Sequence, residues 1–356
     1  MRSGVSILAL FAGGVVGVWF DPSDLPTLFQ DSAGTTPVTA AGQPVGLMLD
    51  KSQGLVLGPE LVNVTTGSYV RSVPVTEGFS PAVLLAAGKF YSVTVSINSA
   101  VGSASYRLNG SSIVPARNAV NGTVNFILFV PVDGNLTING DANGASGNVT
   151  DFSVLLLPGN HATQATAAKR PTYQTSAGLH WLAFDGVDDA MATAAIDFTG
   201  TDKVSVFAGV RKSSDAALGV LLELSSSYSN NGVFTINAPS GAGLSTYAWG
   251  SRGTGSAFFV TPSSYAAPVS NVLSGLGDIS GDVSLLRANG VQVASSASDQ
   301  GTGNFGNYAL NIGARGQTSL FFNGLFYGLI IPGKLASAAE IASTEAYMAG
   351  KTGVVL

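Results

Sequence analysis

The sequence predicts an all-β protein made of two antiparallel β-sandwiches in tandem, with an extended N-terminal arm and one short C-terminal helix. Three observations lead to this prediction. Apolar and polar residues alternate through short runs, turn pairs such as Asn-Gly separate these runs, and charged residues are scarce. The 16 Lys or Arg and 21 Asp or Glu amount to 10% of 356 residues, against roughly 25% in an ordinary soluble domain. Such a chain must expose neutral hydroxyl and amide groups, or cover its surface with other subunits.

The composition also excludes several classes of function. The net charge of −5 and the lack of a basic run argue against a nucleic-acid partner. The absence of Cys excludes disulfides, thiolate metal sites and Cys nucleophiles. The only imidazoles are His161 and His180, and neither lies in a recognisable triad motif. We therefore expect no cofactor, no metal and no catalytic residue.

Residues 1–57 are interpreted as an apolar N-terminal arm for assembly. Residues 5–20 are apolar or small except Ser6, and turn-rich segments follow from Asp21-Pro22. A signal peptide is the first alternative, but no A-x-A cleavage site follows. Sixteen residues interrupted by Gly are also short for a membrane span, so we expect no membrane partner. The side chains expected to dock into a neighbouring subunit are Ile7, Leu8, Leu10, Phe11, Val15, Val16, Val18, Trp19 and Phe20.

Residues 58–158 are predicted to form the first sandwich. In 90–97, Tyr91 and every second residue after it are apolar, while the residues between them are hydroxylated, as in a half-buried strand. The runs 124–130 and 152–157 are more continuously apolar, which is typical of strands covered on both faces. Asn-Gly or Asp-Gly pairs lie between the runs and favour tight hairpins. Short strands at this spacing indicate a sandwich.

Residues 159–356 repeat this pattern and end in a helix. The candidate strands are 181–184, 204–210, 219–224, 233–236, 283–288, 309–312 and 325–331. Ser337 and Glu340 form a capping box, in which each side chain satisfies the other residue's backbone N–H. The helix is therefore predicted over 337–349, with Gly350 as its stop.

A cluster of three aspartates and one isolated glutamate are candidates for metal binding or catalysis. Asp185, Asp188 and Asp189 lie within five positions and could supply oxygen ligands to Ca²⁺, but Asp-Gly after an apolar run indicates a strand ending in a turn. Glu223 lies inside an apolar strand. A glycosidase would need a second carboxylate near it, and we expect instead that Glu223 points outward from a half-exposed strand.

Aromatic residues in one Gly- and Ser-rich region suggest contact with a glycan, because aromatic rings stack on the apolar faces of sugars. The candidate ligand-binding residues are Tyr247, Trp249, Arg252 and Tyr265. Alternation places Tyr247 and Trp249 on one face of a strand. The alternative is that this face is turned toward the core or a neighbouring subunit.

Long segments of the chain resemble structural proteins of tailed bacteriophages and prophages. Residues 28–52 are similar to the N-terminal region of those proteins. Residues 158–164, 182–189, 297–315 and 322–330 are similar to their laminin-G or concanavalin-A-like domain, and 58–157 to a carbohydrate-binding-module-like jelly roll between the N-terminal region and that domain. The resemblance implies two jelly-roll sandwiches with a structural or host-recognition role, and no reaction. The middle domain lacks the Trp usual in its opening and has residues 65–69 (TTGSY) instead, which argues against sugar binding there.

The leading hypothesis is a non-catalytic phage virion protein, a fibre, spike or decoration subunit of the head or tail. It would be made in the bacterial cytoplasm and would bind other virion proteins, or itself as a homo-oligomer, with adsorption to host-surface polysaccharide as an added role. The alternative is a lectin-like glycan-binding module or adhesin. A polysaccharide depolymerase is the third hypothesis.

Overall fold

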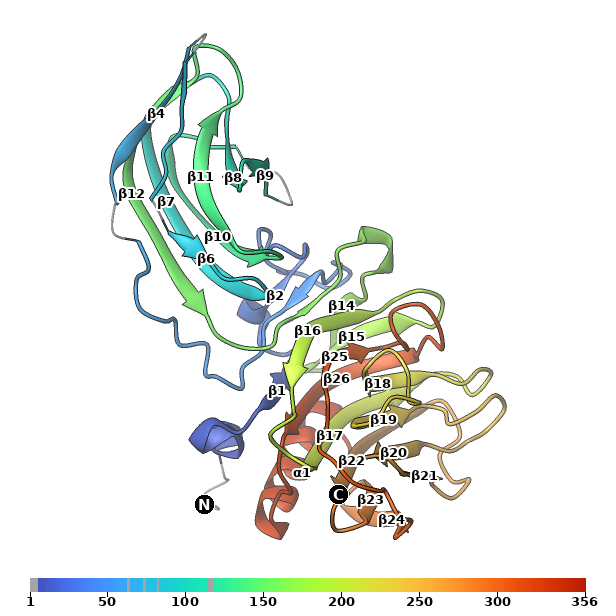
Figure 1. Ribbon diagram of the computed structural model, residues 1–356. Coiled ribbons are helices and arrows are strands. Elements are labelled where there is room, and N and C mark those ends of the chain that lie inside the picture. The colour runs from blue at the N-terminus through green and yellow to red at the C-terminus, as the bar shows by residue number, and fades with distance from the viewer. Residues whose placement is uncertain (1–5, 63–64, 73–74, 82, 114–117) are drawn as a thin grey trace. The chain divides into compact units, whose positions relative to one another are not determined.

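The computed structural model describes residues 6–62, 65–72, 75–81, 83–113 and 118–356 (Figure 1). All strand pairs of this described part are antiparallel, which confirms the predicted fold class. The chain divides into two compact units. Unit 1 comprises 1–32, 36–54 and 159–356, and unit 2 comprises 33–35 and 55–158. The sequence predicted an arm over residues 1–57; of this segment, residues 6–32 and 36–54 belong to the same unit as the C-terminal sandwich.

Unit 2 is a sandwich of two sheets. The larger sheet has the order β10-β7-β12-β4-β5, and the smaller has the order β6-β11-β8-β9. The strands are β4 (Gly67–Ser72), β5 (Val75–Glu77), β6 (Leu84–Leu85), β7 (Lys89–Val101), β8 (Ala104–Leu108), β9 (Ser111–Ser112), β10 (Gly122–Val130), β11 (Gly134–Gly140) and β12 (Ser146–Leu157).

The core of unit 2 follows the predicted alternation. In β7, Tyr91, Val93, Val95 and Ile97 are buried, whereas the hydroxylated residues between them are half-exposed. The long strands bend in an arc, and β11, β8 and β9 lie on its inner side (Figure 1). A simple two-period pattern was enough to predict this core because each sheet has one covered and one open face.

Unit 1 is a larger sandwich, built mainly from the segments that precede and follow unit 2 in the sequence. One sheet has the order β14-β15-β26-β17-β22-β23-β24, with β1 added beside β26, and the other has the order β2-β3-β13-β16-β25-β18-β19-β20-β21. The first sheet contains β1 (Gly17–Phe20), β14 (Thr172–Ser176), β15 (Leu179–Asp185), β17 (Lys203–Lys212), β22 (Val269–Asp278), β23 (Val283–Ala288), β24 (Val291–Ser296) and β26 (Asn323–Pro332). The second contains β2 (Leu28–Phe29), β3 (Leu47–Met48), β13 (Ala162–Thr163), β16 (Met191–Asp197), β18 (Val220–Leu224), β19 (Val233–Asn237), β20 (Ala248–Arg252), β21 (Ser256–Val260) and β25 (Asn307–Ile312).

The N-terminal segment (residues 6–20) is part of the core of unit 1, which corrects the expectation of a docking arm. The 3₁₀ segment η1 (Ile7–Gly14) precedes β1, and β1 pairs along the whole of its length with β26. The fully buried or nearly buried members of the expected docking set are Ile7, Leu10, Phe11, Val18 and Phe20, while Leu8 is exposed and Val15, Val16 and Trp19 are half-buried. The segment is apolar because its own unit covers it, so it needs no second polypeptide.

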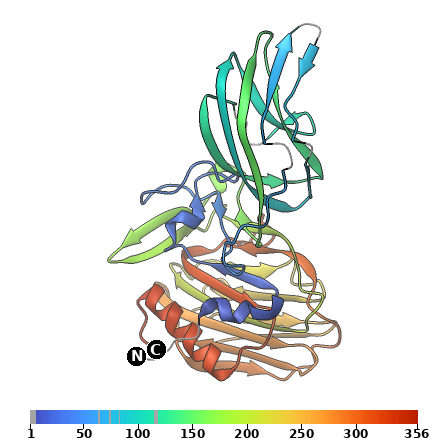
Figure 2. The same ribbon diagram turned by 90° about the vertical axis from the view of Figure 1, so that its left-hand side faces the viewer.

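The helix α1 (Ala338–Thr352) lies with η1 across the outer face of the first sheet (Figure 2). The capping box between Ser337 and Glu340 forms as predicted. The helix runs three residues past the predicted end, because Gly350 stays helical and Gly353, with φ 71°, takes the left-handed cap. Of the helices in the described part of the chain, none has the length and apolar composition needed to cross a membrane. Two further 3₁₀ turns are η2 (Leu25–Thr27) and η3 (Ala167–Lys169).

In unit 1, hydrogen bonds around the buried Asp50 join the chain just before unit 2 to the chain just after it. We call this group of bonds the clamp. The Asp50 carboxylate accepts hydrogen bonds from the backbone N–H groups of Trp19 (2.8 Å), Ser52 (2.8 Å) and Asn160 (2.7 Å). The Asp50 N–H in turn donates to His161 Nδ1 at 2.9 Å. Burial raises the pKa of Asp50, and the hydrogen bonds from the backbone N–H groups oppose this shift. Residues 50 and 160, which are 110 positions apart, are therefore held together at the entrance and exit of the insertion.

Candidate functional site

A row of residues on the outer face of the second sheet of unit 1 forms the main candidate site. Strand register places Glu223 of β18 opposite Thr235 of β19, Thr235 opposite Gly250 of β20, and Gly250 opposite Phe258 of β21. These residues face away from the sandwich core, because their neighbours in each strand, such as Leu222, belong to that core. The row brings a carboxylate and an aromatic ring to one sheet face, across four adjacent strands.

Two aromatic side chains, Tyr228 and Phe258, lie directly over Gly250; we call them the aromatic pair. A Cβ at position 250 would lie 2.6 Å from Tyr228 Oη and 2.7 Å from Phe258 Cδ2. Their ring centroids are 5.3 Å apart, in an edge-to-face arrangement. The missing side chain of Gly250 therefore lets both rings rest on the sheet, and Phe258 keeps 45% of its surface exposed.

The hydroxyl of Tyr228 is fixed by polar partners on β21. It lies 3.0 Å from Ser256 Oγ and donates to the Ala257 carbonyl at 3.1 Å. Burial raises the pKa of Tyr228, with smaller opposing effects from its hydrogen bond to Ser256 and the charge of Arg252. The pair thus combines an open apolar ring with an oriented hydroxyl, which is the combination that sugar-binding surfaces use.

Arg252 faces the same side as the aromatic pair. It follows Gly250 by two positions in β20, and the strand register places it opposite Ser256 of β21. The side chain is half-buried, and its Nε is buried without a hydrogen-bond partner among the described residues. A buried guanidinium donor that finds no acceptor is unusual, because such donors are normally paired.

Glu223 is buried and paired, which corrects the prediction that it points into solvent. It has no exposed surface, and Arg315 contacts it through two nitrogens, with Nη2 2.6 Å from Oε2 and Nε 3.0 Å from Oε1. Burial raises the pKa of Glu223, and Arg315 opposes this shift. The strand is covered on its outer face as well as its inner face, which periodicity cannot reveal. Both carboxylate oxygens are engaged, so Glu223 is arranged as one half of an ion pair.

Tyr247 and Trp249, expected to contact a glycan, are fully buried in the sandwich core. Trp249 Nε1 donates to Ser284 Oγ at 2.9 Å, and its ring lies against Gly275. Asn271 Nδ2 donates to Tyr247 Oη at 2.8 Å. The predicted common face is correct, but it is the inner face, so these two rings have no surface to offer a sugar.

The other two candidate residues are separated in the structure. Tyr265 is half-buried and packs on Tyr247 with ring centroids 5.5 Å apart, whereas Arg252 lies on the opposite face of β20 from Tyr247. Sequence reasoning missed Phe258 as a candidate. A usable signal was present, since residues 253–277 contain no charged residue and place two adjacent Phe in one strand, so that one ring must face outward.

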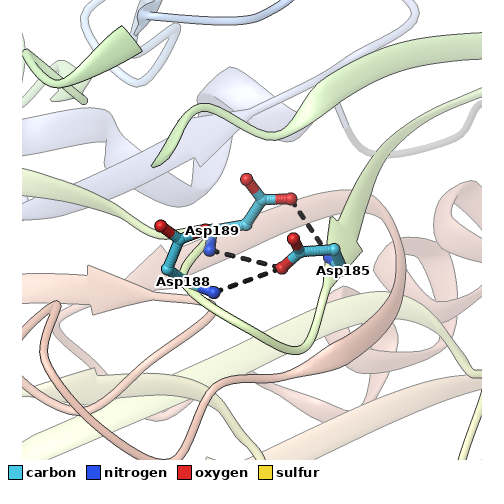
Figure 3. A group of neighbouring side chains, drawn as sticks. All are labelled: Asp185, Asp188 and Asp189. Atoms are coloured by element: carbon cyan, nitrogen blue, oxygen red, sulfur yellow. Dashed lines mark hydrogen bonds between the residues drawn. The ribbon is translucent and has the colours of Figure 1, made fainter. Parts of the chain in front are cut away.

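Asp185, the last residue of β15, and the following Asp188 and Asp189 lie in a turn whose carboxylates accept hydrogen bonds from its own backbone N–H groups (Figure 3). Asp185 Oδ1 accepts hydrogen bonds from the backbone N–H of Val187 at 2.8 Å and of Asp188 at 3.3 Å. Asp189 Oδ2 accepts from the Asp185 N–H at 3.0 Å. The side-chain oxygens of the three residues lie within 4.8 Å of one another, a spacing that a cation could bridge.

Crowding of these carboxylates changes the titration of the most buried one. Burial, followed by the negative charges of Asp185 and Asp188, raises the pKa of Asp189 to about 6. The carboxylates of Asp185 and Asp189 bind backbone N–H groups of the turn, in line with the sequence interpretation of a strand that ends in a turn.

A hollow of about 510 Å³ in unit 1 is lined by Ser23, Gly178, Leu179, His180, Ala346, Tyr347, Gly350 and Lys351. Two of the lining side chains, Tyr347 and Lys351, contact the carboxylate of Asp21. Lys351 Nζ lies 3.0 Å from Asp21 Oδ2, and Tyr347 Oη donates to the same oxygen at 2.8 Å. Burial alone would raise the pKa of Asp21, but hydrogen bonds from Ser23 and the charge of Lys351 lower it to about 2. These contacts join Asp21, just after the N-terminal segment, to α1, and we call them the Asp21 latch. They do not form an open binding site.

No protein-family profile matches the sequence, and no curated protein matches it. Three solved structures show distant similarity. The CBM40 of the Ruminococcus gnavus IT-sialidase, bound to α2,3 sialyllactose, is 19% identical, with 40% of this chain and 83% of that chain covered and a TM-score of 0.33. The NanB sialidase from Streptococcus pneumoniae is 18% identical, with 45% and 27% covered and a TM-score of 0.34. A pentraxin from Limulus polyphemus is 11% identical, with 45% and 78% covered and a TM-score of 0.36. With TM-scores below 0.5, these likenesses are too distant to carry a function to this chain.

Proposed function

We propose that the protein is a non-catalytic carbohydrate-binding protein, and that sugar binds on the outer face of β20 and β21. The observation that supports this most directly is the aromatic pair, in which the half-exposed ring of Phe258 lies beside the oriented hydroxyl of Tyr228. Such a ring stacks on the apolar face of a sugar, while nearby hydroxyls accept and donate hydrogen bonds. The proposal rests on these residues and not on the distant similarity to the sialyllactose-binding module.

Binding can be tested by titrating the purified chain with a panel of neutral and acidic bacterial polysaccharides in a calorimeter. We expect Phe258→Ala to weaken binding at least tenfold, by analogy with nucleic-acid bases, whose stacking on aromatic side chains contributes about 1–3 kcal/mol. Val291→Ala is the matched control, because Val291 is also an exposed apolar strand residue, at 63%, but lies on β24 in the other sheet. Equal affinity of Phe258→Ala and wild type would contradict the proposed site.

The absence of catalysis is part of the proposal. Hydrolysis of a glycosidic bond generally uses two carboxyl groups across the bond, whereas both oxygens of Glu223 are bound by Arg315. We expect no new reducing ends when a bound polysaccharide is incubated with the protein overnight. Release of oligosaccharides that is lost in Glu223→Gln would overturn this and favour the depolymerase hypothesis.

We also propose that the protein works in a phage virion, as part of the tail or head. Support comes from the sequence resemblance described above and from the low charge, since a neutral surface suits a subunit that is covered by its neighbours. The docking arm is not part of this proposal, because five of its nine named residues are buried within unit 1: Ile7, Leu10, Phe11, Val18 and Phe20. Mass spectrometry of purified particles tests it: the chain is expected at several copies per particle, and its absence from intact particles would contradict a virion role.

A further inference from the structure

We propose that the sugar bound at the aromatic pair is acidic, and that Arg252 binds its carboxylate. This deepens the proposed function and depends on it. The first observation is the state of Arg252 itself, whose Nε is buried and has no hydrogen-bond partner in the described part of the chain. No ion pair joins its guanidinium to a described carboxylate. A buried guanidinium donor is normally paired within the fold, so the fold holds this half-buried side chain on the outer face of β20 without an acceptor of its own.

The second observation is that most other arginines of the described chain have partners. Arg107 pairs with Asp141, Arg287 with Glu345, and Arg315 with Glu223. Arg170 donates to three backbone carbonyls. Arg211 also shows no hydrogen bond, but it is exposed, so water satisfies it. Arg252 is thus the half-buried guanidinium of this part of the chain for which the fold supplies no acceptor.

The third observation is the chemistry next to Arg252. Its cross-strand neighbour is Ser256, whose hydroxyl touches Tyr228 Oη. Residues that face one another diagonally across two strands lie about 7–8 Å apart, which brings Arg252 within one sugar ring of Phe258. The one carboxylate of the row, Glu223, is neutralised by Arg315, so it does not repel an incoming anion. A planar carboxylate matches the guanidinium fork and forms paired hydrogen bonds with it.

A matched pair of ligands separates this inference from the proposed function. Each acidic polysaccharide that binds is compared with its own carboxyl-reduced form, which keeps the chain length and linkages but replaces each carboxylate by a hydroxymethyl group. We expect the wild-type protein to bind the acidic form at least tenfold more tightly, because a charge-assisted bidentate contact contributes more than a neutral one. Equal binding of both forms would overturn the acidic specificity and leave the proposed function intact. Binding of neither form would overturn both.

The variants assign the preference to one residue. Arg252→Met, which keeps the apolar stem but removes the charge, should abolish the difference between the two forms. Arg211→Met is the control, because Arg211 is exposed on β17 in the other sheet, and it should keep the full difference. Circular dichroism and thermal unfolding verify that both variants are folded. If Arg252→Met retained the preference for the acidic form, Arg252 would not be the residue that binds the carboxylate.

Discussion

The two units of this protein bury different kinds of side chain. In unit 2, tyrosines aside, Ser105 is the only buried polar side chain among the described residues, and the core is otherwise aliphatic and aromatic. Unit 1 buries several charged groups, including Asp50, Lys212, Glu223 and Glu345. Part of the difference arises because segments of unit 1 cover parts of the outer faces of its two sheets. The N-terminal segment and α1 cover one sheet, and Tyr228 folds over the other.

This comparison shows where sequence patterns lose information. A strand with one open face displays its polar residues to water, so alternation identifies the core. A strand covered on both faces buries polar residues too, and these must find partners in the fold. Unit 1 contains such partners at Asp50, Asp21 and Glu223, and its candidate site lies beside Arg252, a half-buried arginine for which the described residues supply no acceptor. The predictions below test whether buried polar groups and covered faces govern the stability of unit 1.

The largest expected effect concerns the N-terminal segment. Phe20→Ala should lower the free energy of unfolding by about 3–5 kcal/mol, because the ring has no exposed surface and its loss leaves a cavity. Leu8→Ala, in the same segment but 42% exposed, should change it by less than about 0.5 kcal/mol. Urea unfolding measures both. A stable Phe20→Ala variant that failed only in assembly would restore the docking-arm interpretation.

The clamp at the insertion point should be the next most sensitive. Asp50→Ala leaves three backbone N–H groups without their acceptor and should lower the free energy of unfolding by about 3 kcal/mol. Asp50→Asn keeps an acceptor oxygen and should lower it less. Hydrogen exchange should show faster exchange at residues 17–20 and 160–163, with β7 and β12 of unit 2 unchanged. Asp151→Ala, an exposed carboxylate on β12, serves as the unit 2 control. Faster exchange in β7 would contradict the separation of the units.

The Glu223–Arg315 pair should respond asymmetrically. Arg315→Met leaves a fully buried carboxylate unpaired and should cost about 3 kcal/mol at pH 7. Glu223→Gln leaves an arginine that is 30% exposed and can be hydrated, so it should cost only about 1 kcal/mol. The cost of Arg315→Met should shrink at acidic pH, where Glu223 becomes protonated. Equal losses of stability in the two variants would show that the Glu223 carboxylate is in contact with solvent.

The Asp21 latch makes a prediction about acid stability. The folded pKa of about 2 lies below the unfolded value of 3.8, so the latch stabilises the fold fully above pH 4 and is lost as the pH falls through 2. Asp21→Asn should therefore cost about 2 kcal/mol at pH 7, and the difference should shrink toward zero near pH 2. Chemical unfolding at both pH values measures it. A pH-independent difference would assign the effect to packing rather than charge.

The smallest effect should have the opposite sign. The pKa of Asp189 is raised to about 6 in the fold, so its ionisation destabilises the folded state, increasingly as the pH rises from 4 to 6. Asp189→Asn keeps the acceptor for the Asp185 N–H and should raise stability above pH 6, with no gain below pH 4. We expect a gain of about 1 kcal/mol, less than the full shift implies, because water screens the charges of the exposed Asp185 and the half-exposed Asp188. A loss of stability at pH 7 would indicate that the charge is compensated, as a bound cation would do.

The sequence by itself determined the local features: the inward residues of β7, the capping box of α1, the turn after β15, and the shared face of Tyr247 and Trp249. Each depends on neighbours within a few positions. Only the tertiary structure decided which face of β20 is inner, that Glu223 is fully buried, and that residues 17–20 pair with β26. The reason is physical. Burial on the second face of a sheet depends on segments distant in the chain, and no periodicity within a strand records what covers it.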